Sequence, residues 1–377
     1  MKELIEVIEK SLLLANSGST GVVATIVRTR GSTYRRPGAR MLIEPDGTFT
    51  GFISAGCLES DLFEHAKRVL ATSKPARVSY DTTSEDDIIW GLGLGCNGFV
   101  DVLLEPLSAP NTRAKLDFLS RSLQTTSTDV LVTVVDSTHP DAEPGSYLMI
   151  DQQEKFSSDI KNPGLRAQLQ REIQRMSQEA HSGYATIEIG DYRLELTAEM
   201  ISPPVPLTIF GAGPDVVPIL ALADSLGWNT TVIDKRPEDE LRRRFPKAHS
   251  ARTLIQPIDV EALNIAERSV VLIMTHNYLV DTELLRVLLP APVLYIGLLG
   301  PKRRGDQILE ALRKENVKIS EERLSRFHSP VGLDIGSESS IEIALSIVSE
   351  IQAVLSKRSG GFLRDRNAPI HNAHPEE

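Results

Sequence analysis

Cysteine is nearly absent from this chain, with 2 residues in a sequence of 377. A disulfide framework is therefore excluded, and a reducing compartment is the natural setting. No apolar run approaches the roughly 20 residues that a transmembrane helix needs, and no apolar signal core follows Met1. Basic residues are outnumbered, 41 against 51 acidic ones, which disfavours nucleic acid as a partner. We expect a cytoplasmic protein that binds neither nucleic acid nor a membrane.

The length allows two domains, and a Pro-rich stretch at Ser202–Pro206 marks the boundary between them. Short apolar strands alternate with helices after this boundary. The pattern predicts an α/β domain over residues 203–360 with a Rossmann-like, doubly wound parallel sheet.

Residues 1–202 read differently, as a mixed α/β domain with short strands, a hairpin and helices. Residues 109–202 of this domain carry the least recognisable chemistry. No internal repeat is apparent. The tail at 361–377 is polar and is expected to be mobile.

A glycine-rich turn follows the first strand of the second domain. Gly211 allows a tight turn, Gly213 lets a phosphate approach the backbone, and the helix that begins near Asp215 offers free N–H groups. Asp234 ends the next strand, at the spacing expected of a ribose-binding carboxylate. The turn departs from the dinucleotide pattern at Pro214 and Val216. It therefore fits either a nucleotide site or a turn of the fold that binds nothing.

Two more loops follow strands of this second domain. His276 comes after an apolar strand, where it is either a ligand contact, a general base or an ordinary loop histidine. Gly300 precedes a helix that begins with basic residues, the outline of an anion site.

The first domain contains three unusual loops. The loop at Gly31–Met41 combines Ser32 with Arg35 and Arg36, whose planar guanidinium groups suit a phosphate or a carboxylate. The alternative is a solvated turn with charged edges.

Both cysteines lie in the other two loops. Gly56, Cys57 and Glu59 belong to the loop at Gly51–Glu59, which leads into a helix whose N-terminus would stabilise a thiolate. Gly95 and Cys96 belong to the glycine-rich loop at Gly91–Gly98. Thiolates are soft metal ligands and nucleophiles, although free cysteine is also often buried for packing alone.

Taken together, these motifs resemble the XdhC/CoxI family. The three loops of the first domain resemble its N-terminal region. Its C-terminal Rossmann region is resembled by five stretches: Phe210–Asp215, Asp234–Arg236, Met274–Tyr278, Tyr295–Arg304 and His328–Glu342. The sequence departs from the family pattern at Pro214, where relatives usually carry His, and at Ala55, where Gly is common.

The resemblance implies an accessory factor rather than a free-standing enzyme. Such a factor binds molybdenum cofactor, assists its sulfuration by a cysteine desulfurase and inserts it into an apo molybdo-hydroxylase of the xanthine dehydrogenase type, often as a homodimer. Cys57 and Cys96 would contact molybdenum or relay sulfur. The expected cofactor-binding residues are Ser32, Arg35, Arg36, Gly56, Cys57, Glu59, Gly95, Cys96, Gly211, Gly213, Asp215, Asp234, His276 and Gly300.

Two other functions stay open. One is an NAD(P)-dependent oxidoreductase with the nucleotide at Gly211, Gly213 and Asp234 and with His276 as acid or base. The other is an interaction protein that keeps the fold without a ligand.

Overall fold

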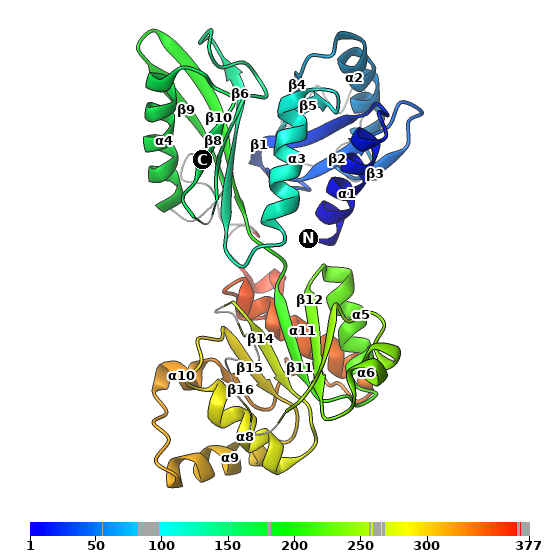
Figure 1. Ribbon diagram of the computed structural model, residues 1–377, viewed down its shortest axis with the longest axis vertical. Helices are drawn as coiled ribbons and strands as arrows, with labels where there is room; N and C mark the ends of the chain where they lie inside the picture. The colour runs from blue at the N-terminus through cyan, green and yellow to red at the C-terminus, as the bar shows by residue number, and fades with distance from the viewer. Residues whose placement is uncertain are drawn as a thin grey trace. The chain divides into compact units, whose positions relative to one another are not determined.

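The computed structural model describes residues 1–54, 56–81, 98–151, 153–178, 182–255, 258, 265, 268–367 and 370. The chain divides into two compact units (Figure 1). The N-terminal unit consists of Glu3–Pro203, and the Rossmann unit consists of Pro204–Ile370 together with Met1–Lys2. Of the tail predicted to be mobile, residues 361–367 and 370 are described, and they include a 3-10 turn, η2 (Leu363–Asp365).

Two five-stranded antiparallel sheets form the N-terminal unit. The first has the order β3-β2-β1-β5-β4 and consists of β1 (Val22–Gly31), β2 (Arg40–Ile43), β3 (Phe49–Gly51), β4 (Ala76–Asp81) and β5 (Gly98–Pro106). The second has the order β8-β7-β6-β10-β9 and consists of β6 (Asp129–Ser137), β7 (Tyr147–Ile150), β8 (Phe156–Ser158), β9 (Gly183–Ile189) and β10 (Tyr192–Ile201). The helices are α1 (Lys2–Asn16), α2 (Glu59–Thr72), α3 (Pro110–Ser122) and α4 (Pro163–Gln178).

The two sheets belong to two copies of one module. Each module runs helix, three strands, helix, two strands, and the strand order within the two sheets is the same. Each first strand also carries a β-bulge at the same place: the pairing skips Val27 in β1 and Val135 in β6. The expectation of no internal repeat is therefore wrong. Strand order and bulge position need similar apolar residues rather than identical ones, so the repeat is easily missed in the sequence.

Helices separate and cover the two sheets. One buried cluster packs α2 on one face of the first sheet, and another packs α4 on one face of the second. A third cluster joins α1 and α3 to β1, β2, β6 and β7, so both sheets share this core.

The Rossmann unit contains one six-stranded parallel sheet of order β13-β12-β11-β14-β15-β16. Its strands are β11 (Pro206–Phe210), β12 (Asn229–Asp234), β13 (Ser250–Thr253), β14 (Val270–Ile273), β15 (Tyr295–Leu298) and β16 (Phe327–His328). Its described helices are α5 (Val216–Leu226), α6 (Glu238–Arg244), α8 (Tyr278–Leu288), α9 (Lys302–Lys314), α10 (Glu321–Ser325) and α11 (Ser340–Leu355). This is the strand order of a Rossmann fold, which confirms the predicted fold class.

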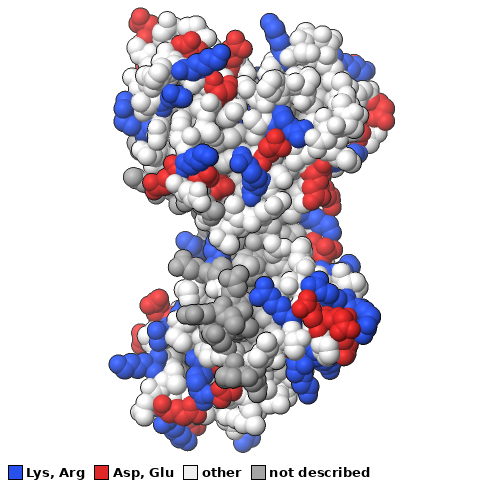
Figure 2. Space-filling view, viewed as in Figure 1, with Lys and Arg blue, Asp and Glu red and all other residues white. Residues whose placement is uncertain are grey.

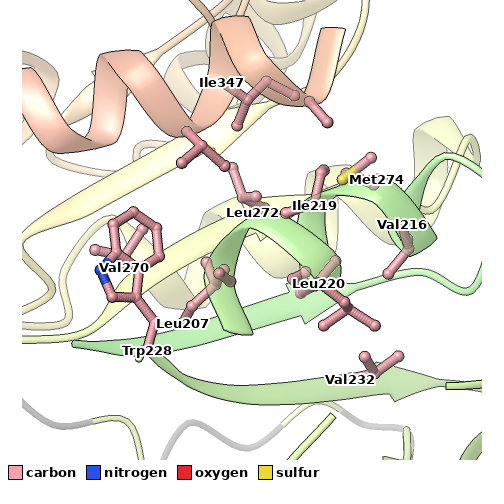
Figure 3. Close-up of a cluster of buried hydrophobic side chains, with 14 of the residues drawn as sticks. Leu207, Val216, Ile219, Leu220, Trp228, Val232, Val270, Leu272, Met274 and Ile347 are labelled. Carbon is pink, nitrogen blue, oxygen red and sulfur yellow. The ribbon is translucent and has the colours of Figure 1, made fainter. Parts of the chain in front are cut away.

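Apolar side chains hold both faces of this sheet. Figure 3 shows Val216, Ile219 and Leu220 of α5 packed with Ile347 of α11 over the strands. A second cluster packs α8 and α9 on the opposite face. The strand order reverses between β11 and β14, and ligands of open α/β sheets bind at the carboxyl ends of the strands at such a switch point.

Basic and acidic side chains are interspersed over the face shown in Figure 2. Among the described residues, every helix is too short or too polar to cross a lipid bilayer.

Candidate functional site

The topology of the first sheet brings the three motif loops of the N-terminal unit to one end. β2 is antiparallel to both β1 and β3, and β5 is antiparallel to both β1 and β4. β1, β3 and β4 therefore run in the same direction. The loops that follow these strands therefore leave the sheet at the same end. They are residues 32–39, 52–58 and 82–97. Residues 82–97, which include the predicted site residues Gly95 and Cys96, lie outside the described residues.

The first of these loops packs closely against the start of β5. A side chain at Gly98, where β5 begins, would place its Cβ 2.3 Å from the carbonyl oxygen of Ser32. Glycine is required here because the two backbones touch. In the second module the corresponding connections at 159–162 and 190–191 are shorter than 52–58 and 82–97, whereas the loop at 138–146 is of similar length to 32–39 but contains no arginine.

We call residues 32–39 the arginine loop and residues 52–58 the cysteine loop. A cluster of buried hydrogen bonds fixes the cysteine loop. Glu59, the first residue of α2, accepts hydrogen bonds from the backbone N–H groups of Ile53 (3.2 Å) and Ser54 (2.8 Å) and from the Ser54 hydroxyl (2.5 Å). The same hydroxyl oxygen accepts from the N–H groups of Cys57 and Leu58, each at 3.0 Å. Ser54 therefore binds the backbone of the turn that precedes α2, while Glu59 holds Ser54 in place.

The cluster presents Cys57 to solvent. Cys57 is exposed, and it follows Gly56, whose φ of 103° is a left-handed value that favours glycine. Glu59 is 8% exposed. Burial raises the pKa of Glu59, but the hydrogen bonds from Ser54 and Ile53 outweigh burial and hold its pKa below the ordinary value. In the structure the Glu59 carboxylate binds groups of its own loop, and the expected contact with a ligand stays a prediction.

The two predicted arginines differ in their surroundings. Arg35 pairs with Glu3 of α1 at 2.8 Å and lies over the ring of Phe52 at 4.3 Å, so it ties the arginine loop to the cysteine loop. Arg36 is half-buried, and its Nε atom is buried without a hydrogen-bond partner among the described residues. An unpaired buried N–H group favours an acceptor brought by a ligand. Ser32 is exposed beside these arginines.

In the Rossmann unit, the glycine turn meets β14 across the switch point. Gly211 has a φ of 124°, and a Cβ there would lie 2.3 Å from the carbonyl oxygen of Met274. A Cβ on Gly213 would lie 2.1 Å from Oδ1 of Asp215. Both glycines thus have a reason within the fold itself, in addition to any approach by a phosphate.

Asp215 and His276 face each other at this switch point. His276 Nε2 lies 3.1 Å from Asp215 Oδ2, while Oδ1 of Asp215 is buried without a hydrogen-bond partner among the described residues. The His276 side chain is 62% exposed, and its backbone has a φ of 57°, which is uncommon outside glycine. The predicted turn and the predicted histidine are therefore neighbours in space.

The remaining predicted residues lie along the same edge of the sheet. Asp234 ends β12, and its Oδ1 accepts a hydrogen bond from the Arg236 guanidinium at 2.6 Å. Gly300 has a φ of 141° and lies against Arg304, which pairs with the buried Asp281 at 2.5 Å. Asp281 also accepts a hydrogen bond from Thr275, the residue before His276.

Metal ions are bound in proteins by clusters of side chains. Within the described ranges, His, Cys, Asp and Glu side chains form no group of three or more placed to hold a metal ion. Cys96, which was expected to join Cys57 as a metal ligand, lies outside these ranges, so that hypothesis stays a prediction.

Sequence patterns alone missed several residues that shape these loops. Glu3 and Phe52 contact Arg35, and Ser54 accepts hydrogen bonds from the backbone of the cysteine loop. Ser54 had no capping signal, because it lies four residues before Leu58, the N-cap residue of α2. Glu3 had none, because its partner is distant in the sequence.

The fold defines a two-unit α/β protein that joins a duplicated antiparallel module to a Rossmann unit. The chain belongs to the XdhC/CoxI family. Residues 207–351 match the XdhC Rossmann domain, and residues 14–81 match the XdhC and CoxI family.

Relatives match over most of the chain. It is 31% identical to a protein of Bacillus subtilis (strain 168) that is named a probable xanthine dehydrogenase subunit, over 88% of this chain and 92% of that protein. It is 23% identical to the "Molybdenum cofactor insertion chaperone PaoD" of Escherichia coli (strain K12), over 90% of this chain and 84% of that protein. A crystal structure described as a xanthine dehydrogenase from Bacillus halodurans matches with a TM-score of 0.73 and 32% identity, over 94% of this chain and 97% of that one.

Proposed function

We propose that this protein is a maturation factor that binds molybdenum cofactor, assists its sulfuration and inserts it into a molybdo-hydroxylase of the xanthine dehydrogenase type. Support comes from the relatives, one of which is named a molybdenum cofactor insertion chaperone and is matched over 84% of its length. In this proposal the cofactor is cargo, and the chain itself catalyses no turnover of a metabolite.

The observation that carries the proposal is the exposed Cys57 on a loop held by buried hydrogen bonds, at the end of the sheet where β1, β3 and β4 end. A thiolate is a soft ligand, which suits a molybdenum–sulfur group. Arg36 supplies a guanidinium with an unpaired Nε, which suits the phosphate of the pterin. Both chemical requirements of the cargo are met by residues of this end.

The partners follow from the chemistry. Sulfuration needs a donor of sulfur, so we propose a cysteine desulfurase as one partner, and insertion needs an apo molybdo-hydroxylase as the other. A homodimer is part of the same proposal. The compartment expected from the sequence is the cytoplasm.

The test is anaerobic binding of molybdenum cofactor to the purified full-length protein, measured by fluorescence of the pterin after release and oxidation. We expect one pterin per chain in the wild type, and weaker binding in Cys57→Ala and in Arg36→Ala. Arg113→Ala, which changes a partly exposed arginine on α3 that binds Asp117 and Asn16, is the matched control and should bind pterin as the wild type does. Absence of pterin from the wild-type protein under these conditions would refute the proposal.

A second candidate function is an NAD(P)-dependent oxidoreductase. The strand order of the Rossmann unit favours it, with Asp234 ending the second strand and His276 at the switch point. The carboxylate of Asp215 counts against it, because it lies against Gly213, where a negatively charged pyrophosphate would approach. Titration with NADH and NADPH decides: saturable micromolar binding with hydride transfer, in a protein that binds no pterin, would favour the oxidoreductase.

A further inference from the structure

The duplicated N-terminal unit carries buried carboxylates at equivalent positions of its two modules. In the strand register, Asp101 of β5 and Glu195 of β10 each lie opposite the first residue after the bulge of the neighbouring strand. Glu105 and Glu199 lie four residues farther along these strands and are also buried. Burying a carboxylate is unfavourable unless it is paired, so each must have a partner.

The partner of Glu199 lies in the other module. Arg40 of β2 binds it with both guanidinium nitrogens, at 2.8 and 2.7 Å, and the two side chains are only 5% and 4% exposed. Arg40 also donates a hydrogen bond to the carbonyl oxygen of Gly38 at 2.9 Å. Gly38 has a φ of 90°, and a Cβ there would lie 2.8 Å from Oε2 of Glu199. The base of the arginine loop therefore rests on a carboxylate of the second module.

Glu105 makes the reciprocal arrangement. It pairs at 2.5 Å with Lys115 of α3, each side chain being 6% exposed, and Lys115 donates to the carbonyl oxygen of Gly145 at 3.1 Å. Gly145 also has a φ of 90°, and its Cβ would lie 3.0 Å from Oε1 of Glu105. Gly145 belongs to the loop after β6, the counterpart of the arginine loop. Each module thus supports one loop of the other through a carboxylate, a cation and a glycine.

We propose that Glu199 is a positioning residue for the site in the first module, acting through Arg40 on the loop that carries Ser32, Arg35 and Arg36. Its counterpart Glu105 supports a loop without these motifs. The second module, whose loops carry none of these motifs, then serves as the support of the site. The link to cofactor binding rests on the proposed function; the positioning of the loop does not.

The duplication supplies the matched control. Glu199→Gln removes the charge and keeps the shape of the side chain, and Glu105→Gln makes the same change at the equivalent position. Hydrogen exchange of the full-length protein, read by mass spectrometry, reports both loops at once. In Glu199→Gln we expect exchange at residues 31–39 to accelerate about tenfold, the factor that corresponds to weakening one charge-assisted hydrogen bond, with residues 138–146 unchanged.

Glu105→Gln should give the reverse result, faster exchange at 138–146 and wild-type exchange at 31–39. The proposal is overturned if either variant loosens both loops equally, or if residues 31–39 do not respond to Glu199→Gln. If Glu199→Gln does not fold, Arg40→Lys replaces it, since it retains the charge but lacks the fork that reaches both Glu199 and Gly38.

Binding of molybdenum cofactor, released from a molybdo-hydroxylase and read as pterin fluorescence, forms the second arm. We expect the dissociation constant to rise about tenfold in Glu199→Gln and to stay at the wild-type value in Glu105→Gln. If the wild-type protein binds no pterin, the proposed function fails, and the exchange experiment still decides whether Glu199 positions the loop. If pterin binding is normal in Glu199→Gln despite a loosened loop, the link between positioning and cofactor binding is overturned.

Discussion

Replacing Glu59 with Gln tests whether a buried carboxylate holds the cysteine loop. The Ser54 hydroxyl oxygen already accepts hydrogen bonds from the N–H groups of Cys57 and Leu58, so its single proton must go to Glu59. The other oxygen of Glu59 accepts from Ile53 and Ser54. Glutamine has one acceptor oxygen, so its amide group must face either the hydroxyl proton or the two backbone N–H groups.

At one of these contacts two hydrogen-bond donors then face each other, and the remaining hydrogen bonds are no longer strengthened by a negative charge. Loss of a hydrogen bond to a charged group costs about 1.5–3 kcal/mol, so we expect Glu59→Gln to lower the free energy of unfolding by about 2–4 kcal/mol at pH 7. Glu64→Gln, on the exposed side of the same helix where Glu64 pairs with Lys67 at the surface, is the control and should change it by less than about 1 kcal/mol.

The dependence on pH gives an independent check. Because the pKa of Glu59 is lowered in the folded protein, its contribution is fully present above the ordinary value of 4.5 and is lost as the pH falls through the folded value. The difference in stability between the wild type and Glu59→Gln should therefore shrink below pH 4.5.

The assay is urea unfolding followed by hydrogen-exchange mass spectrometry, which reads the N-terminal unit separately from the Rossmann unit; a single transition cannot be assumed for a protein of two units. If Glu59→Gln proved as stable as Glu64→Gln at pH 7, the argument that Glu59 anchors the loop would be wrong. A difference that did not shrink in acid would contradict the role of its charge.

Two further predictions concern the Rossmann unit. Gly211→Ala should destabilise it by more than about 2 kcal/mol, because the new Cβ meets the backbone of Met274 in a left-handed conformation. Gly213→Ala should cost less, because the clashing group is the side chain of Asp215, which can move; calorimetry would compare the two melting temperatures, and equal losses would contradict the distinction. Asn277 caps α8 by accepting hydrogen bonds from two backbone N–H groups, so Asn277→Ala should cost about 1 kcal/mol, and an unchanged melting temperature would show that water replaces the cap.

Local sequence patterns were sufficient for the Rossmann unit. Strands buried on both faces of a parallel sheet are continuous apolar runs, so Leu207–Phe210 and Val270–Met274 were recognisable as strands and coincide with β11 and β14 within one residue. The glycine turn after the first strand indicated where a helix begins. Alternation of strands and helices then predicted the doubly wound topology, which the strand order confirms.

The duplication of the N-terminal unit illustrates what such patterns miss. Strand order is a property of long-range pairing, and β1 pairs with β5 across most of the first module. The sequence therefore pointed to three unusual loops without showing that they leave the sheet at one end. Gly213 shows the same limit on a smaller scale, because whether a carboxylate already lies against it depends on the side chain of Asp215.

By itself, the sequence determined the fold class of each unit, the Pro-rich composition of the stretch between the units and the reactive side chains of the motif loops. Periodicity, turn residues and reactive side chains are local properties of a sequence. Only the tertiary structure decided which of those residues meet and which serve as supports. Glu59 hydrogen-bonds the cysteine loop, Arg35 contacts Glu3 and Phe52, and Glu199 binds Arg40 at the base of the arginine loop. Glu199 and Arg40 are 159 residues apart in the chain, and each buried charge finds its partner only when the two modules pack together.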